Sequence, residues 1–361
     1  MEVNLKDLKN SPLPKYYRIK EFLLNYIKKK KLKPGDGLPS ENKLASMFKV
    51  TKMTASHALN ELVSQGILYR IQGKGTFVTS IEEKTPPIYL YLPLVSSLDP
   101  YFTGPLIGSF AHTLAEKDYS LTIKYFPDGK KINLNPAQQN SGAMVVAALK
   151  EGEGLSENSF NFIKTPVIYL GSHPEELVDC IAFTNEEGAK KAVDYLVKLG
   201  HQKIAFFSGN KDNISNQERE KGYLKGLEVN GLNWRLILSG NYSEESDYQR
   251  TKKLLQRKQG PTAILCASDL IALGIMCAFR ETGLRVPRDI SIVGFGDYEV
   301  AHCSHPSLTT VSLPIKEMGK QLAELAIARI ENKNNFKLQR IILPTKLVIR
   351  KSARKRNRRS G

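Results

Sequence analysis

The side chains best suited to contact a ligand lie on one face of a short predicted helix near the start of the chain. Beginning at Thr51, hydrogen-bonding side chains follow at helical spacing together with one lysine and one methionine: Thr51, Lys52, Met53, Thr54, Ser56, His57 and Asn60. One positive charge among hydroxyl and amide groups suits contacts with phosphates and base edges in a major groove, where a methionine can touch a thymine methyl. This face predicts nucleic-acid recognition.

A second candidate contact region is the run Gln72-Gly73-Lys74-Gly75, which separates two short stretches of strand character, residues 67–71 and 76–78. A tight hairpin tipped with glycine and lysine can approach DNA closely. No helix follows the two glycines, so the run does not form a phosphate-binding loop.

Other reactive residues form no recognisable catalytic or metal-binding pattern. The sequence has no Gly-x-Ser-x-Gly, Walker or His-Glu-x-x-His motif. His302 and His305 lie three residues apart without an obvious third ligand, and the four cysteines form no Cys-x-x-Cys pair. We therefore expect no enzyme activity, no metal and no cofactor, and we expect the cysteines to be buried free thiols.

Three predicted helices position the polar face. Residues 16–30 carry apolar side chains at helical spacing, and Ser40 is placed to cap a second helix. Thr51 is placed to cap the third helix, which Gly66 ends. About three residues join the second and third helices, which is the geometry of a helix-turn-helix.

The net charge of +17 is concentrated at the two ends of the chain. Residues 1–80 hold 15 lysines and arginines against 6 acidic residues, and residues 350–361 hold seven basic residues and no acidic one. The middle of the chain is nearly neutral. The basic first part of the chain, residues 1–80 (the head), is followed by a nearly neutral part (the body), which indicates that the head binds a polyanion. Residues 350–361 are too charged to fold alone and are predicted to be a disordered tail.

The polar, proline-ended segment 80–87 is typical of a linker. After it, runs of strand length alternate with helical patterns over some 260 residues, which predicts two doubly wound parallel sheets. The predicted organisation is therefore a winged helix-turn-helix domain at 1–79 and a two-lobed α/β domain at 88–349. No stretch approaches the roughly 18 apolar residues of a membrane span, and the polar start is not a signal peptide, so we expect a cytoplasmic protein without membrane contact.

The head resembles the GntR-type winged helix. The resemblance rests on Leu38-Pro39-Ser40-Glu41, Val50-Thr51-Lys52, Ala58-Leu59-x-x-Leu62 and Gly73-Lys74-Gly75-Thr76-Phe77-Val78. It implies that Lys52, Thr54 and Ser56 contact bases or phosphates and that Gly73 and Lys74 lie in the minor groove. Asn42 and Ser56 stand where the family often has arginine, which indicates an unusual DNA target.

The body resembles the LacI/GalR effector domain, which is similar to periplasmic binding proteins. The motifs are Asp99-Pro100-Tyr101-Phe102, Gly200-His201, Arg219-x-x-Gly222-Tyr223, Ala267-Ser268-Asp269, Val286-Pro287 through Phe295, and Pro306-x-Leu308-Thr309-Thr310-Val311. The head and body together resemble the arabinose repressors of Gram-positive bacteria.

This second resemblance implies that a small-molecule effector binds between two lobes. It places seven residues in the cleft: Asp99, Tyr101, Phe102, Arg219, Tyr242, Ser268 and Asp269. Asp269 could instead cap the helix that begins there. Gly171, Gly296 and Leu313 replace polar residues of the family, with Asp297 the remaining acid of its motif. The alternatives are a sugar, an acidic ligand such as a sugar acid or sugar phosphate held by Arg219, and a pocket that binds nothing.

The expected function is that of a transcription repressor of carbohydrate-related genes, a homodimer on a palindromic operator of double-stranded DNA at the nucleoid. A ligand changes the spacing of the two heads and thereby the affinity for DNA. The rival functions are a solute-binding protein and an enzyme on a doubly wound fold. An activator fits the sequence as well as a repressor does.

Overall fold

The chain folds as two units, residues 1–84 and 85–361, and the division falls inside the predicted linker. The computed structural model describes residues 14–64, 66–79, 87–93, 99–126, 131–132, 142–147, 154–155, 165–171, 178–240, 244–255, 260–331 and 337–356.

The first unit is a three-helix bundle followed by a hairpin. Its elements are α2 (Lys15–Lys30), α3 (Glu41–Phe48), α4 (Lys52–Ser64), β1 (Leu68–Ile71) and β2 (Gly75–Val78). The core comes from the helical apolar stripes, with Ile19, Leu23 and Leu44 fully buried. Ser40 caps α3 as predicted, because its Oγ accepts a hydrogen bond from the Lys43 amide at 3.3 Å. Gly37 forms a bridge with Phe77, so the segment before α3 flanks the antiparallel hairpin.

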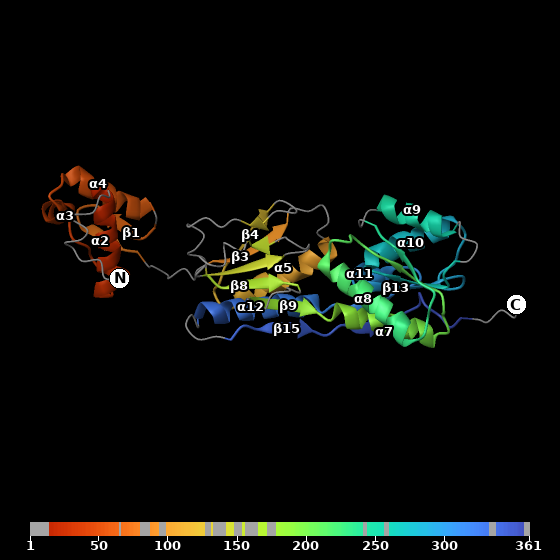
Figure 1. The fold of residues 1–361 in the computed structure, drawn as a ribbon. Helices are drawn as coiled ribbons and strands as arrows, with labels where there is room; N and C mark the ends of the chain where they lie inside the picture. Colours follow the sequence, from red (N-terminus) through yellow and green to blue (C-terminus); the bar gives the residue numbers. More distant parts are fainter. Residues whose placement is uncertain are drawn as a thin grey trace. The chain divides into compact units, whose positions relative to one another are not determined.

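The second unit has two lobes, each built on a six-stranded sheet (Figure 1). In the first lobe all paired strands are parallel, in the order β15-β9-β8-β6-β3-β4. The bounds of its elements are β3 (Ile88–Pro93), α5 (Pro100–Ala115), β4 (Leu121–Phe126), β6 (Ala143–Ala147), β8 (Val167–Leu170), β9 (Asp179–Phe183), α12 (Ile315–Glu331) and β15 (Arg340–Leu343), with a small pair β5 (Lys131–Ile132) and β7 (Gly154–Leu155).

The sheet of the second lobe has the order β11-β10-β12-β13-β14-β16. Its elements are α7 (Asn185–Lys198), β10 (Ile204–Phe207), α8 (Ile214–Val229), β11 (Leu236–Leu238), α9 (Glu244–Leu255), β12 (Ala263–Cys266), α10 (Asp269–Glu281), β13 (Ser291–Gly296), α11 (Glu299–Cys303), β14 (Thr309–Ser312) and β16 (Lys346–Val348). The pairs from β11 to β14 are parallel, as predicted, and β16 adds an antiparallel strand at the edge beside β14.

The chain crosses between the lobes after β9, after β14 and between β15 and β16. Two of these crossings are bonded to each other. The Thr345 amide donates to Thr184 Oγ1 at 2.9 Å, and Thr345 Oγ1 donates to the Thr184 carbonyl at 3.1 Å. Helix α12 follows the second crossing and packs against α5 in the first lobe (Figure 1). Each lobe is therefore built from separate segments of the chain.

Two sequence predictions about this unit are wrong. Residues 350–356 are not a disordered tail: Ser352 is fully buried, accepts from the Thr309 amide at 2.8 Å and donates to the Ile292 carbonyl at 2.6 Å. These partners lie some 40 to 60 residues away, so the local charge density gave no sign of them. The last five residues, 357–361, lie outside the described part. Two of the four free cysteines, Cys277 and Cys303, are exposed rather than buried.

Candidate functional sites

Helix α4 presents the predicted polar face to solvent. Ala55, Ala58, Leu59 and Leu62 are fully buried, while Lys52 is exposed and Met53 is 81% exposed. Thr51 Oγ1 accepts from the Thr54 amide at 3.3 Å and so caps the helix. The polar side chains and Met53 are therefore accessible to a partner, while the apolar stripe of the helix holds the core of the unit.

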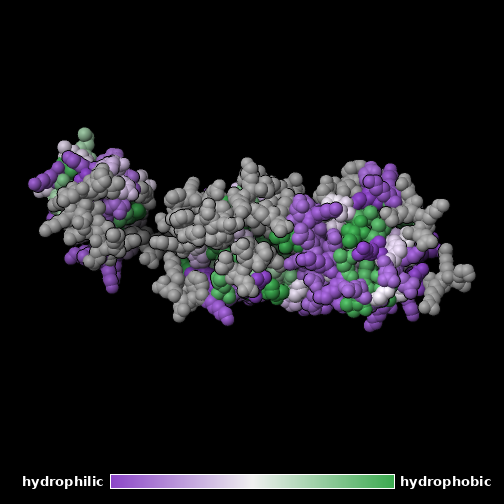
Figure 2. Space-filling model, in the orientation of Figure 1, coloured by the Kyte–Doolittle hydropathy of each residue, from purple (hydrophilic) through white to green (hydrophobic). Residues whose placement is uncertain are grey.

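The hairpin presents the second predicted contact region. Gln72, Gly73 and Lys74 form the turn between β1 and β2, and all three are exposed. Gly73 has φ +75°, a conformation that favours glycine. Among the coloured atoms of the first unit, Figure 2 shows mostly hydrophilic side chains at the surface. His57 is also exposed, and its ring packs edge-on against Tyr16.

A cluster of charges joins the start of α3 to α4 and β1. Arg70 Nη2 lies 2.8 Å from Glu41 Oε1, and the same Arg70 atom lies 3.5 Å from Ser56 Oγ. Lys52 Nζ lies 4.0 Å from the other Glu41 oxygen. Sequence reasoning missed Arg70 because its strand register was not known. The cluster shows that its guanidinium reaches the polar face of α4.

The second unit contains a cavity of about 230 Å³ that both lobes line. Its polar lining residues are Asp99, Thr103, Asn185, Asn213, Ser215, Arg219, Ser268 and Tyr298. The rest of its lining is apolar or glycine and includes Phe102, Phe183, Leu313 and Met318. Four predicted cleft residues therefore lie together here: Asp99, Phe102, Arg219 and Ser268.

Tyr298 reaches from the second lobe to the first and was not predicted. Its ring stacks on Tyr101 with centroids 5.8 Å apart, and its hydroxyl donates a hydrogen bond to the Asp99 carboxylate. Asp99 also accepts from the Tyr101 amide at 2.9 Å and caps α5. Burial raises the pKa of the Asp99 carboxyl, and these hydrogen bonds together with Arg219 oppose that rise. Burial and the Asp99 charge raise the pKa of Tyr298 well above its usual value.

Arg219 lines the cavity from α8 and is the cation among its lining residues. Its Nε donates to Asn185 Oδ1 at 3.0 Å and its Nη1 donates to the Ala267 carbonyl at 2.6 Å. The guanidinium also stacks over the Phe295 ring at 4.1 Å. These contacts fix its position in the wall.

The three residues that replace polar residues of the family, Gly171, Gly296 and Leu313, have different structural consequences. Gly171 and Leu313 line the cavity without adding a polar group. Gly296 has φ +137°, and a Cβ atom there would lie 2.8 Å from the Tyr298 ring, so this glycine makes room for the tyrosine. Asp297 does not line the cavity, because its carboxylate pairs with Arg350 at 2.6 Å.

The capping interpretation of Asp269 is wrong. Ser268 caps α10, since its Oγ accepts from the Ile271 amide at 3.2 Å. Asp269 is fully buried outside the cavity lining, accepting from Thr310 Oγ1 at 2.5 Å and from the Tyr298 amide at 2.9 Å. It therefore helps to position Tyr298. Tyr101 also lies off the lining, on the Tyr298 ring, and Tyr242 lies outside the described residues.

The described ranges show no group of three His, Cys, Asp or Glu side chains arranged to hold a metal ion. Within the same ranges, no helix combines the length and apolar character that crossing a membrane requires.

Comparisons with known proteins match both units. Residues 15–78 match the family model for bacterial regulatory proteins of the gntR family, and residues 193–353 match that for a periplasmic binding protein-like domain. The chain is similar to the arabinose metabolism transcriptional repressor of Geobacillus stearothermophilus, with 28% identity over 96% of this chain and 100% of that protein.

Two solved structures share the fold of the second unit. A LacI family regulator from Enterococcus faecium, with bound ribose, has a TM-score of 0.66 and 21% identity and covers 75% of this chain and 100% of that one. The lac repressor dimer bound to operator has a TM-score of 0.62 and 23% identity, covering 82% of this chain and 98% of that one.

A capped, lysine-bearing helix beside a glycine-tipped hairpin, joined to a two-lobed domain with an internal cavity, fits the class of transcriptional regulators, which is also the class of the similar protein from Geobacillus stearothermophilus. The chain joins a region that matches the gntR family to one that matches a periplasmic binding protein-like domain, as the resemblances in its sequence predicted.

Proposed function

We propose that the protein is a repressor of carbohydrate-related genes that binds a palindromic operator as a homodimer. The observation that carries the proposal is the exposed face of α4, whose opposite face is fully buried. The DNA-contacting residues are Ser40, Thr51, Lys52, Met53, Thr54, Ser56, His57, Gln72, Gly73 and Lys74. A two-fold dimer presents two such faces to two half-sites. The lac repressor structure, a dimer on its operator, supports this arrangement.

A small molecule in the cavity modulates the affinity for DNA. Because both lobes line the cavity, a ligand that fits one lobe arrangement better than another shifts the equilibrium between them, by no more than its difference in affinity. The protein then acts at the nucleoid in the cytoplasm and carries out no catalytic step.

Replacing Lys52 by alanine should weaken binding to the DNA upstream of the protein's own gene about tenfold at roughly 0.1 M salt, since a cationic phosphate or base contact is lost. Fluorescence anisotropy over a salt series should show a slope reduced by about one, with two chains per duplex. Lys117→Ala, an exposed change in the second unit, is the control. An unchanged affinity and slope for Lys52→Ala would remove α4 from the interface. A protein that binds no DNA would favour the solute-binding alternative.

Arg70→Ala should weaken DNA binding to a similar extent, because its guanidinium reaches the polar face of α4 beside Ser56. Glu41→Gln is the matched variant: it breaks the same ion pair but leaves Arg70 free to meet a phosphate. We expect Glu41→Gln to bind DNA at least as tightly as the wild type. Equal losses for both variants would mean that the pair only supports the fold.

A further inference from the structure

Most polar groups that line the cavity in the second unit already have a hydrogen-bond partner within the protein. Seven of its eight polar side chains already make a hydrogen bond within the protein. Asp99, Asn213 and Ser268 cap helices, Thr103 donates to the Asp99 carbonyl, Asn185 pairs with Arg219, and Tyr298 donates to Asp99. A polyhydroxylated molecule needs a partner for every hydroxyl that it buries, and each unpaired hydroxyl costs free energy. The described lining therefore opposes a neutral sugar.

The charges of the lining favour an anion. The Asp99 carboxylate is turned onto the first turn of α5 and onto Tyr298, and Asp297 is drawn away by Arg350. Arg219 uses Nε and Nη1 for protein contacts, and in the described part of the chain no hydrogen bond engages its Nη2. A guanidinium edge facing a low-polarity cavity binds a carboxylate or phosphate strongly.

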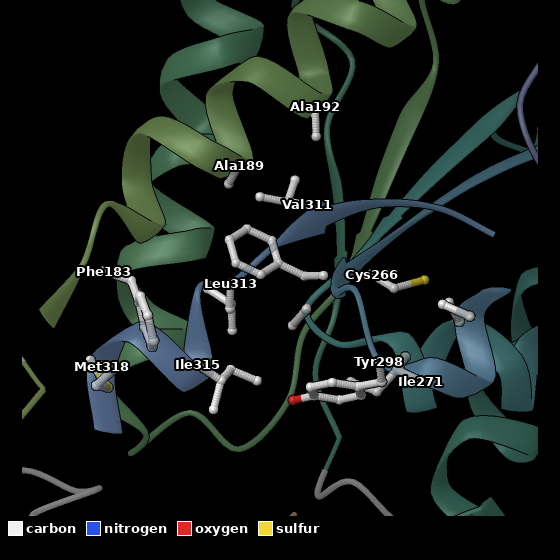
Figure 3. Close-up of a cluster of buried hydrophobic side chains, with 14 of the residues drawn as sticks. Phe183, Ala189, Ala192, Cys266, Ile271, Tyr298, Val311, Leu313, Ile315 and Met318 are labelled. Carbon is white, nitrogen blue, oxygen red and sulfur yellow. The ribbon is translucent and has the colours of Figure 1, made fainter. Parts of the chain in front are cut away.

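The remaining wall suits an apolar body. Leu92, Leu106, Leu170, Phe183, Leu313 and Met318 surround the cavity. In Figure 3, Phe183, Leu313 and Met318 gather together, and Tyr298 extends its hydroxyl end toward their side of the view. The volume of about 230 Å³ lies below the roughly 300–1,000 Å³ of sites for drug-sized molecules, so the ligand is small.

We propose that the cavity takes a small organic anion with a largely apolar body, whose acidic group binds Arg219. This inference rests on the proposed function, in which the cavity holds the effector. Tyr298 acts as the specificity-determining residue, because its side chain, which Gly296 admits, engages Asp99 and leaves that carboxylate unavailable to ligand hydroxyls.

Isothermal titration calorimetry on the full-length protein tests the ligand class with four probes: 3-phenylpropionate, hexanoate, 3-phenylpropionamide and D-ribose. We expect at least one of the two acids to bind and D-ribose to give no heat of binding. Where 3-phenylpropionate binds, its amide should bind at least about tenfold more weakly. Binding of D-ribose, equal binding of the acid and its amide, or binding of neither acid would overturn the proposal.

Two variants separate recognition from folding. Arg219→Lys keeps a charge but loses the planar fork, and should weaken the acid about tenfold or more. Leu313→Asn leaves Arg219 in place and should also weaken the acid, because it adds a polar group to the apolar wall. Operator binding by anisotropy is measured on the same samples. Intact operator binding without acid binding rejects only this inference, whereas loss of operator binding in the wild type rejects the proposed function.

Discussion

Replacing Arg329 by alanine is expected to lower the free energy of unfolding by about 3–5 kcal/mol, the range for removing one partner of a buried ion pair. Arg329 and Asp179 are 3% and 2% exposed, and their bidentate contacts measure 2.6 and 2.7 Å. The ion pair connects α12, which contains Arg329, to β9, which begins at Asp179. Arg329 also donates to the Lys337 carbonyl, and Asp179 accepts from the Gln339 amide, so the pair fixes the approach to β15. Without Arg329, the Asp179 charge stays buried with one remaining described donor.

Denaturant unfolding of the full-length protein, followed by circular dichroism, measures this effect. Lys320→Ala on the same helix is the control, since its 3.8 Å pair with Glu324 is exposed and should change stability by less than about 0.5 kcal/mol. The double replacement Arg329→Met with Asp179→Leu should recover most of the loss, because no unpaired charge then remains. Similar unfolding curves for Arg329→Ala and Lys320→Ala would show that the pair is not buried in solution.

The alternation of strands and helices made most of the fold predictable, because the strands of a doubly wound sheet are continuous apolar runs. Strands β9 and β14 are hard to recognise in the sequence for a common reason. Asp179 opens β9, and Thr309 and Thr310 lie in β14, so both runs contain polar residues that are fully or almost fully buried. Their partners, Arg329, Ser352 and Asp269, are distant in sequence. Burial that depends on such partners leaves no periodic signal.

Site residues were predictable where their role depends only on residues close to them in the sequence. Capping by Ser40 and Thr51 follows from neighbouring amides, and the exposed face of α4 follows from helical spacing. Tyr298 was not predictable, because its place depends on Gly296 and on Asp99, about 200 residues earlier in the chain. The same holds for Asp297, whose position in the family motif suggested the cavity until Arg350 was seen to bind it.

Replacing Asp269 by asparagine is expected to make the stability of the second lobe less sensitive to pH. Burial raises the pKa of the Asp269 carboxyl from 3.8 to about 6, against the opposing hydrogen bonds from Thr310 and Tyr298. Between these two values the folded protein binds more protons than the unfolded chain, so this carboxyl lowers stability as the pH rises from about 4 to about 6. Above pH 6 the full penalty applies, and it amounts to about 3 kcal/mol.

A neutral asparagine amide at this position carries no such penalty. The difference in unfolding free energy between Asp269→Asn and the wild type should therefore grow by about 2 kcal/mol, in favour of the variant, as the pH rises from about 4.5 to about 7.5. Trp234, the one tryptophan, packs against the core of the same unit, and its fluorescence during denaturation reports the unfolding of the second lobe. Asp212→Asn is the control, since it makes the same chemical change at an exposed carboxyl of the second lobe. If wild type and Asp269→Asn keep a constant difference in stability over this range, the carboxyl is ionised throughout. Thr310 and the Tyr298 amide would then hold it as a structural anion.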